Sequence, residues 1–244
     1  NDGLAERVRS STDRIVGFIA SLPMNNPDAA VKEANRAVEE LDARGVQVFT
    51  NVLGKPLSEP EFFPIFETMV KHDLPVWIHP MRGPNFPDYQ HESASEYEIW
   101  FTFGWPYETS ACMTRLIYSG IFDKLPDVKI ITHHFGGMVP FFAEKIGIGF
   151  QQIFNGNSTM NPLAEQAGLK KQPKEYYKMF YADTATNGSA AAAKCGLEFF
   201  GPDHSLFATD TPFDPEGGSM LIRETINAIK YLDIEPETKE KICH

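Results

Sequence analysis

Short apolar runs alternate with amphipathic segments along the whole chain. Six runs rich in β-branched and aromatic residues stay apolar almost to their ends, as strands buried on both faces of a parallel sheet do. These runs cover residues 15–22, 46–52, 74–79, 128–134, 179–184 and 205–210. Helical periodicity between them predicts helices over residues 28–43, 59–72, 107–121, 139–154, 189–196 and 218–232. Strands that alternate with helices of this length predict repeated βαβ units.

The positions of polar residues favour a (β/α)8 barrel over an open doubly wound sheet. Polar side chains gather at the carboxyl ends of the predicted strands, where barrel enzymes carry their active sites. They are Asn51, His79, His133, His134, Asp183 and Asp210. No glycine-rich phosphate loop follows a strand, which argues against the nucleotide-binding form of the open sheet. No repeat or linker divides the chain, so we expect one barrel domain over residues 1–244.

Composition and charge narrow the class of protein. Hydrophobic residues make up 42% and charged residues 23% of the chain, as in ordinary globular domains. The formal net charge is -11 and Lys and Arg form no cluster, so we expect no nucleic-acid partner. No apolar run approaches the roughly 20 residues that span a bilayer, so we expect no membrane partner. The widely spaced Cys112, Cys195 and Cys243, and an N-terminus without a signal-peptide core, predict a reducing, cytoplasmic location.

Three strand ends together form a candidate metal site. His79 ends an apolar strand, and Asp210 ends the last strand in the sequence FATDTPF. Each residue alone also fits a structural role, as a hydrogen-bonded strand end or a turn cap. Together with His133 or His134 they bring imidazole and carboxylate groups to one face, which favours Zn²⁺ or another divalent ion. Adjacent strand residues point to opposite faces, so only one of these two histidines is expected to face the barrel interior, and the other to pack or support it from behind.

The segment of residues 81–106 is long for a βα loop, and long loops on barrels are usually functional. Arg82 is placed to bind a substrate carboxylate. A surface ion pair of Arg82 with Asp88 or Glu92 is the alternative. Among the many aromatic residues of this segment, Trp105 is expected to contact substrate, and most of the others to pack the loop over the barrel mouth.

Several motifs resemble those of the amidohydrolase-related metal-dependent barrel enzymes, which include 2-amino-3-carboxymuconate-6-semialdehyde decarboxylase and γ-resorcylate decarboxylase. They are VWIHP at 76–80, GWPYETSACMTRLIYSGIFDKLPDVKIITHHFGGMVPFF at 104–142 and LFATDTPFDP at 206–215. Residues 17–52 also resemble the third and fourth βα units of that family. The six predicted strands then correspond to strands three to eight. The first two strands, with the H-x-H or E-x-H pair that completes the family's metal site, are expected to be absent from this chain.

The resemblance implies a metal-dependent, non-oxidative decarboxylase of an aromatic or muconate-type carboxylic acid. It implies His79 and Asp210 as metal ligands, and His134 and Asp210 as the catalytic groups. With strand alternation, it also implies that His134 lies near the metal site while His133 points into the helix layer. The metal would be a divalent ion, first Zn²⁺, with Mn²⁺ and Mg²⁺ as alternatives. A homodimer is expected, because family members are commonly dimers. A hydrolase or hydratase of a lactone, ester, amide or enol is the alternative enzyme, and a barrel that has lost its metal is the non-enzymatic alternative.

Overall fold

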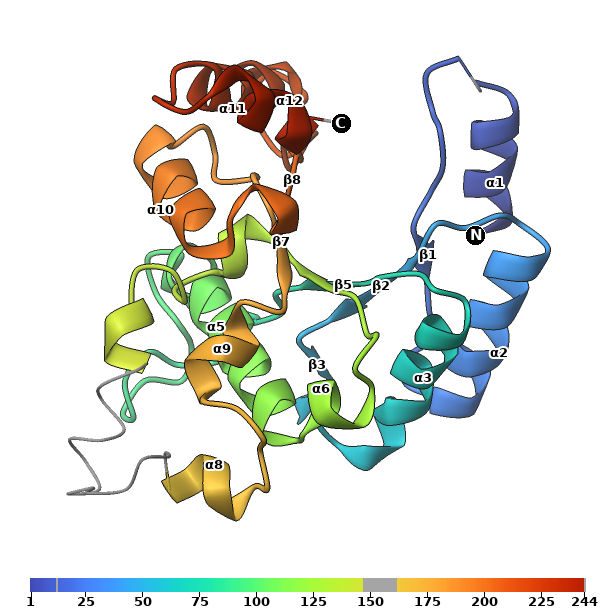
Figure 1. Ribbon diagram of the computed structural model, residues 1–244, viewed down its shortest axis with the longest axis vertical. Coiled ribbons are helices and arrows are strands. Elements are labelled where there is room, and N and C mark those ends of the chain that lie inside the picture. Colours follow the sequence, from blue (N-terminus) through green and yellow to red (C-terminus); the bar gives the residue numbers. More distant parts are fainter. Residues whose placement is uncertain (12, 147–161, 244) are drawn as a thin grey trace.

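Six strands form one parallel sheet in the order β1-β2-β5-β6-β7-β8. The structure is a computed structural model and describes residues 1–11, 13–146 and 162–243 (Figure 1). The strands are β1 (Ala20–Ser21), β2 (Val46–Phe49), β5 (Val76–His79), β6 (Ile130–Thr132), β7 (Tyr181–Asp183) and β8 (Ser205–Leu206). Each lies within one of the six apolar runs, so the predicted parallel α/β architecture is confirmed. A separate antiparallel pair joins β3 (Asn51–Val52) to β4 (Lys55–Pro56).

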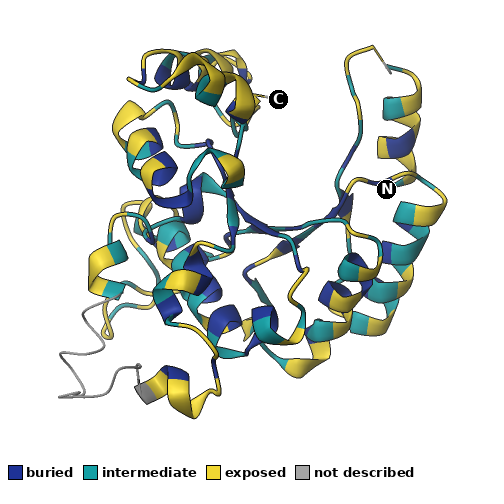
Figure 2. Cartoon of the chain, viewed as in Figure 1, coloured by how far each residue is buried: buried dark blue, intermediate teal, exposed yellow. Residues whose placement is uncertain are grey.

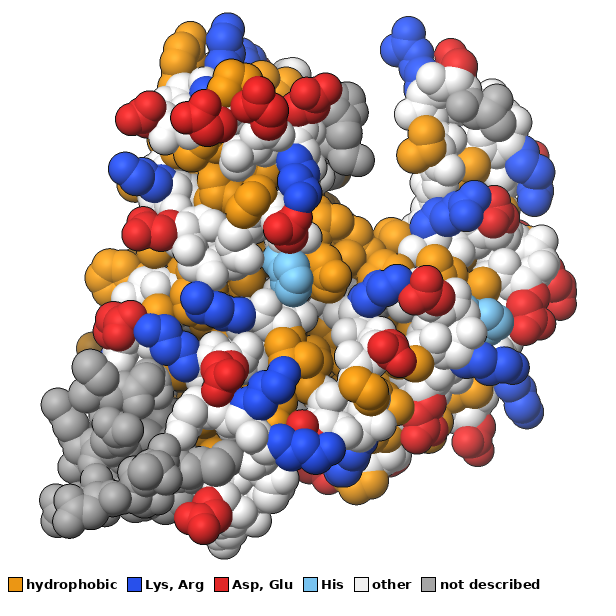
Figure 3. All heavy atoms as spheres, viewed as in Figure 1, with side chains coloured by type: hydrophobic (Ala, Val, Ile, Leu, Met, Phe, Trp, Pro, Cys, Tyr) orange, Lys and Arg blue, Asp and Glu red, His pale blue; other side chains and the backbone are white. Residues whose placement is uncertain are grey.

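The sheet is strongly curved, as part of a barrel wall is. β1 and β8 are its two edges, and within the described residues they are not paired with one another. They lie on opposite sides of the opening between α1 (Asp2–Arg9) and the pair α11 (Ser219–Lys230) and α12 (Pro236–Cys243) (Figure 1). Hydrophobic side chains are visible along the floor of this hollow (Figure 3). The correspondence of these six parallel strands to strands three to eight of a (β/α)8 barrel stays a prediction.

Helices cover the convex side of the sheet. The helix α2 (Pro27–Glu39) packs on α3 (Phe63–Lys71), and α10 (Ala190–Phe200) packs on α11. The other helical segments are α4 (Ile99–Thr102), α5 (Gly104–Tyr118), α6 (Ile121–Lys124), α8 (Pro162–Gln166), α9 (Pro173–Tyr177), η1 (Pro60–Phe62), η2 (His134–Gly136) and η3 (Pro202–His204). The predicted helix over residues 139–154 lies partly outside the described residues. None of the helices in the described part of the chain is long and apolar enough to cross a membrane.

Strand register separates an apolar outer face from an inner face that carries the candidate site. Val46, Val76 and Ile130 are aligned across three neighbouring strands, and all three are fully buried against the helices. Figure 2 shows this buried layer between the sheet and its helices. The alternate positions face inward, where Trp77 and His79 of β5 lie. The core therefore fixes the orientation of His79, because a register slip of one residue would expose the apolar face.

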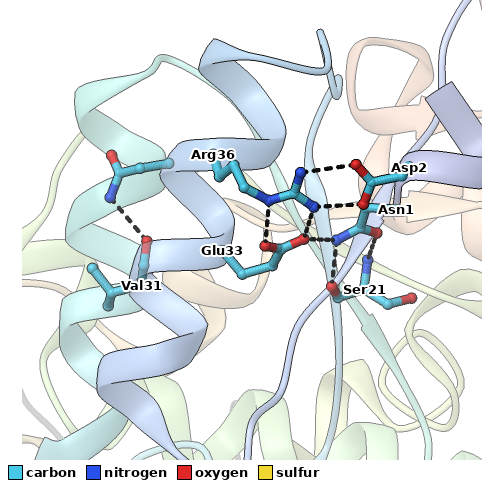
Figure 4. Close-up of polar contacts among 7 residues, drawn as sticks. Asn1, Asp2, Ser21, Val31, Glu33 and Arg36 are labelled. Carbon is cyan, nitrogen blue, oxygen red and sulfur yellow. Dashed lines mark hydrogen bonds and ion pairs between the residues drawn. The ribbon is translucent and has the colours of Figure 1, made fainter.

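Polar side chains tie the start of α1 to β1 and α2 (Figure 4). Asn1, which precedes α1, donates to the carbonyl of Ser21 (2.9 Å) and accepts from the amide of Ser21 (2.9 Å). The same Asn1 amide donates to Glu33 of α2 (2.6 Å). Arg36 then joins Glu33 to Asp2 through a bidentate contact of 3.0 and 2.8 Å. This network holds α1 and α2 together beside β1.

Candidate metal and acid–base site

His79 stands at the carboxyl end of β5 in a state suited to metal binding. Its Nδ1 lies 2.7 Å from the carbonyl of Pro80, which only accepts hydrogen bonds, so Nδ1 carries the proton and Nε2 has a free lone pair. Burial, together with nearby His133, lowers the pKa of His79 to about 4. The ring is therefore neutral near pH 7, as a metal-binding imidazole must be.

Aromatic side chains hold the His79 ring from two sides. Phe49, its register partner on β2, meets it edge-on with ring centroids 5.8 Å apart. Trp105 of α5 also meets it edge-on, at 5.2 Å. The indole nitrogen of Trp105 donates to the carbonyl of Arg82 (3.1 Å), so only the ring of Trp105 is free to contact a ligand. The structure thus brings Trp105 to the site, where it packs directly on His79.

Both histidines that follow β6 lie beside His79. The ring centroid of His133 is 5.2 Å from that of His79, and the ring centroid of His134 is 6.2 Å away. The prediction that His133 points into the helix layer is therefore wrong. Strand alternation holds only within extended backbone, and β6 ends at Thr132. His134 adopts a φ of 56°, a left-handed conformation that turns the chain and brings both rings to the same side.

Asp183, at the end of β7, connects the two histidines. Its side chain is fully buried. One carboxylate oxygen lies 2.7 Å from Nδ1 of His133, and the other accepts from the amides of His134 (2.8 Å) and Ala185 (3.1 Å). Burial alone would raise the pKa of Asp183, but the hydrogen bond and charge of His133 outweigh it and hold that pKa below its usual value. Sequence reasoning noted Asp183 at a strand end but gave it no role.

His134 is held in one orientation by the chain beyond β7. Its Nδ1 lies 2.6 Å from the carbonyl of Ala185, so Nδ1 carries the proton and Nε2 is free to exchange one. The neighbouring Thr184 hydroxyl bonds both the carbonyl and the amide of Ala208, at 2.9 and 3.0 Å. The hydroxyl therefore extends the contact between β7 and β8 towards Asp210.

Asp210 lies four residues beyond β8, half-buried, with a φ of 62°. Burial raises the pKa of the Asp210 carboxyl group. Among its charged neighbours, His134 and His133 lower this pKa and Asp183 raises it, so the carboxylate interacts electrostatically with all three. In the described ranges, no group of three or more His, Cys, Asp or Glu side chains is arranged to hold a metal ion. The sharing of one ion by His79 and Asp210 accordingly stays a prediction.

Arg82 pairs with a residue far along the chain. One guanidinium nitrogen lies 3.2 Å from Glu108 of α5, and the side chains of both residues are only about one-fifth exposed. The guanidinium also lies over the ring of Phe86, 5.2 Å from its centroid. The alternative of an ion pair with Asp88 or Glu92 is therefore wrong. Within the described residues, Nε of Arg82 is buried without a hydrogen-bond partner.

A hollow of about 450 Å³ opens beside Arg82 at the carboxyl ends of β1, β2 and β5. The apolar side chains of Phe49, Met81 and Phe86 form part of its lining, and each is more than two-fifths exposed. Phe49 also touches His79, so this hollow adjoins the histidine cluster. A mostly apolar hollow with one cation suits a flat acid whose carboxylate approaches the cation.

The turn after His134 requires glycine at Gly137, which has a φ of 64°. A Cβ there would lie 2.4 Å from the carbonyl oxygen of Pro106. We expect Gly137→Ala to lower the free energy of unfolding by about 2–5 kcal/mol, the sum of left-handed strain and overpacking. Gly217→Ala is the matched control, because Gly217 has a φ of 68° and no atom near its Cβ position. Urea unfolding measures the free energy of unfolding of both variants. Equal losses of stability in the two would show that the close approach to Pro106 does not cause the effect.

Parallel strands with imidazoles and carboxylates at their carboxyl ends are the arrangement in which (β/α)8-barrel enzymes carry their active sites. The sequence model of the amidohydrolase family matches residues 1–244, and the chain belongs to this family. The resemblance inferred from the motifs around His79, His134 and Asp210 is thereby confirmed.

Named relatives in this family are decarboxylases. The chain is 30% identical to 2-amino-3-carboxymuconate-6-semialdehyde decarboxylase of Dictyostelium discoideum over 99% of its length and 62% of the relative. It is 31% identical to γ-resorcylate decarboxylase of Polaromonas sp. JS666 over 88% of its length and 65% of the relative. The chain thus spans less than two thirds of these curated relatives.

A solved structure shows the same fold with a metal. Dihydroxybenzoic acid decarboxylase from Polaromonas sp. JS666, with bound manganese and the inhibitor 2-nitroresorcinol, superimposes with a TM-score of 0.79 at 25% identity. The match covers 99% of this chain and 70% of that one. The expectation of a divalent metal in this family is therefore supported, while zinc in particular is not tested.

Proposed function

We propose that this chain, as one barrel domain, carries the chemistry of a metal-dependent, non-oxidative decarboxylase of an aromatic or muconate-type carboxylic acid. The observation that supports it most is the cluster of His79, His133, His134 and Asp183 at the carboxyl ends of three neighbouring strands. The family's named relatives, which break the bond between a carbon and its carboxylate, agree with this proposal.

His79 and Asp210 are the proposed metal ligands. Neutral His79, with Nε2 free, fits a divalent ion, and so does a carboxylate at the end of a barrel strand. The bound ion would polarise substrate oxygens and stabilise the negative charge that develops as CO2 leaves. Zn²⁺ is the proposed ion, with Mn²⁺ and Mg²⁺ as alternatives, because mixed imidazole and carboxylate ligands accept all three.

His134 is the proposed proton donor, with Asp210 as the second catalytic group. When the carbon–carboxylate bond breaks, its electron pair stays on the ring or chain carbon, which must then take up a proton. Nδ1 of His134 keeps its proton on the carbonyl of Ala185, so Nε2 is the atom that would take a second proton from solvent and deliver it to this carbon.

Arg82 and Trp105 are the proposed substrate contacts. Arg82 borders the hollow and would bind the substrate carboxylate while it keeps Glu108 as its second partner. The ring of Trp105 would contact the flat substrate next to His79. A homodimer and a cytoplasmic location remain expectations. Exposed Tyr97 and Phe103 in the segment of residues 81–106 suit a subunit contact.

Turnover in D2O tests the reaction type. The full-length protein, loaded with a divalent ion and given a panel of aromatic and muconate-type acids, should release CO2. Deuterium should then appear at the carbon that carried the carboxylate. A product that keeps its carboxylate and gains an oxygen from water would refute the decarboxylase assignment and indicate a hydrolase or hydratase.

A further inference from the structure

We propose that Gly104 and Glu108 of α5 are positioning residues for Arg82, and that through Arg82 they set the preference of the adjoining hollow for a carboxylate. The proposal rests on the proposed function, in which Arg82 binds the substrate carboxylate, and names the residues that hold it ready to do so. Among the described residues that line this hollow, Arg82 alone is charged. The placement of its guanidinium therefore determines how well the hollow binds an anion.

Three contacts fix Arg82, and all of them come from one turn of α5. The indole nitrogen of Trp105 donates to the carbonyl of Arg82 (3.1 Å), which holds its backbone. The carboxylate of Glu108 lies 3.2 Å from Nη1, which holds the guanidinium. Gly104 lies against the middle of the side chain, where a Cβ would stand 2.5 Å from Cδ and 3.1 Å from Nε of Arg82. Gly104 and Glu108 are four residues apart and so lie on the same face of the helix.

The space left open at Gly104 is explained by Arg82 and not by the local backbone. Gly104 is not among the residues with a left-handed φ, so its own conformation accepts any side chain. It is also the first residue of α5, and glycine is, after proline, the least favourable residue in a helix. A Cβ at this position would displace the arginine side chain. The absence of a side chain at Gly104 therefore serves the arginine rather than the helix.

Glu108 holds the guanidinium from the side away from the hollow. Arg82 lines the hollow of about 450 Å³, whereas Glu108 lines a second one of about 340 Å³. Phe86 borders both hollows, and the guanidinium lies over its ring at 5.2 Å from the centroid. Nε of Arg82 is buried, so the terminal nitrogens are the atoms left for a ligand. A planar guanidinium fixed in this way is pre-organised for a carboxylate.

An ion pair that only ties the segment of residues 81–106 to α5 is the structural alternative. The side chains of Arg82 and Glu108 are about one-fifth exposed, and ion pairs in contact with solvent contribute little to stability. Such a tie requires neither an open space beside the arginine side chain nor a guanidinium at the wall of a hollow. The two explanations differ in what a variant changes: stability in the first, and affinity for a carboxylate in the second.

Binding of benzoate and benzamide to the full-length protein tests the proposal without an assay of turnover. Benzamide is the neutral counterpart of benzoate with nearly the same shape. Glu108→Gln and Glu108→Ala both remove the negative charge, but only glutamine can still accept from Nη1 of Arg82. Isothermal titration calorimetry should show benzoate bound about 2–10-fold more weakly by Glu108→Ala than by Glu108→Gln, the cost of ordering one long side chain. Benzamide should bind equally to both.

Repeating this comparison with Arg82→Gln present isolates the coupling between the two residues. If Glu108 acts through Arg82, its two variants should bind benzoate equally once the guanidinium is gone. Arg82→Gln alone should weaken benzoate binding about 10-fold or more, the contribution of a hydrogen bond to a charged group. Equal affinities of the two Glu108 variants in the unmodified background, or a difference that persists without the guanidinium, would overturn the role of Glu108.

Gly104→Ala tests the open space, and it decides alone if Glu108→Ala does not fold. We expect benzoate to bind about 10-fold more weakly, benzamide to be little affected, and the urea midpoint to stay equal or rise, because alanine favours a helix. Gly3→Ala is the matched control, since Gly3 lies near the start of α1 with no atom near its Cβ position. It should leave benzoate affinity unchanged. Unchanged affinity in Gly104→Ala as well would overturn the assignment of Gly104.

These outcomes are separate from those of the proposed function. Benzoate affinity that does not depend on Arg82 would overturn this proposal, while CO2 release by the protein would still support the decarboxylase. A loss of benzoate affinity that is coupled between Glu108 and Arg82, in a protein that releases no CO2 from any acid, would refute the decarboxylase. The assignment of Gly104 and Glu108 as positioning residues would then stand.

Discussion

Replacing His134 with alanine should slow turnover of the acid substrate by about 10²–10⁴-fold, the usual contribution of a general acid or base. The ring is fixed by a 2.6 Å contact to the carbonyl of Ala185, so the variant loses a proton donor that is already in position. Metal content should stay close to that of the unmodified protein, because His134 is the more distant of the two rings from His79. Single-turnover kinetics and metal analysis on the same preparations measure both effects.

His204→Ala is the control for this experiment. His204 also places Nδ1 against a carbonyl, that of Phe180 at 3.0 Å, but it precedes β8 and stacks on Tyr181 at the opposite end of the sheet. Its loss should leave turnover nearly unchanged. An unaltered rate in His134→Ala would instead transfer the proton-transfer role to Asp210 or to a group outside the described residues.

Asp183→Ala should lower the free energy of unfolding by about 3–5 kcal/mol, because it leaves several buried polar groups without their partner. The fully buried carboxylate accepts from two backbone amides and faces His133, and alanine would leave all three groups without an acceptor. Urea unfolding followed by circular dichroism measures the loss at neutral pH, where the low pKa of Asp183 keeps it ionised.

Two further variants serve as comparisons for the stability loss expected in Asp183→Ala. Asp183→Asn keeps the shape and the acceptor for both amides, so it should lose less stability than alanine. Asp203→Ala removes an exposed carboxylate paired with Lys241 and should leave the unfolding midpoint almost unchanged, because solvent screens that pair. A loss in Asp183→Ala no larger than in Asp203→Ala would contradict the structural importance of the buried carboxylate.

The sheet was predictable because burial on both faces leaves a continuous apolar signal. All six predicted runs contain a strand, but the strands are shorter than the runs. The run at residues 15–22 yields only Ala20–Ser21. Only Ala20 and Ser21 of this run pair with β2, and Val16 is 90% exposed. The length of β1 is therefore set by its pairing with β2, which local periodicity does not encode.

Parts of the site were predictable for the same reason, and others were not. His79 was correctly placed because it lies within a regular strand. His133 was placed wrongly because one left-handed residue, His134, breaks the alternation. Glu108 as the partner of Arg82 lies 26 residues away on a helix, and no local pattern connects the two. The role of Asp183 depends on three partners that meet only in the folded protein.

The packing of indoles around the histidines gives the protein a built-in optical reporter. Of its three tryptophans, Trp105 contacts His79 and Trp77 contacts His133, while Trp100 touches Trp105 at 5.9 Å. Indole emission responds to charge and polarity within a few ångströms. Events at either imidazole therefore change the intrinsic fluorescence of the whole chain, and ligand titrations can be followed on unlabelled protein at micromolar concentration.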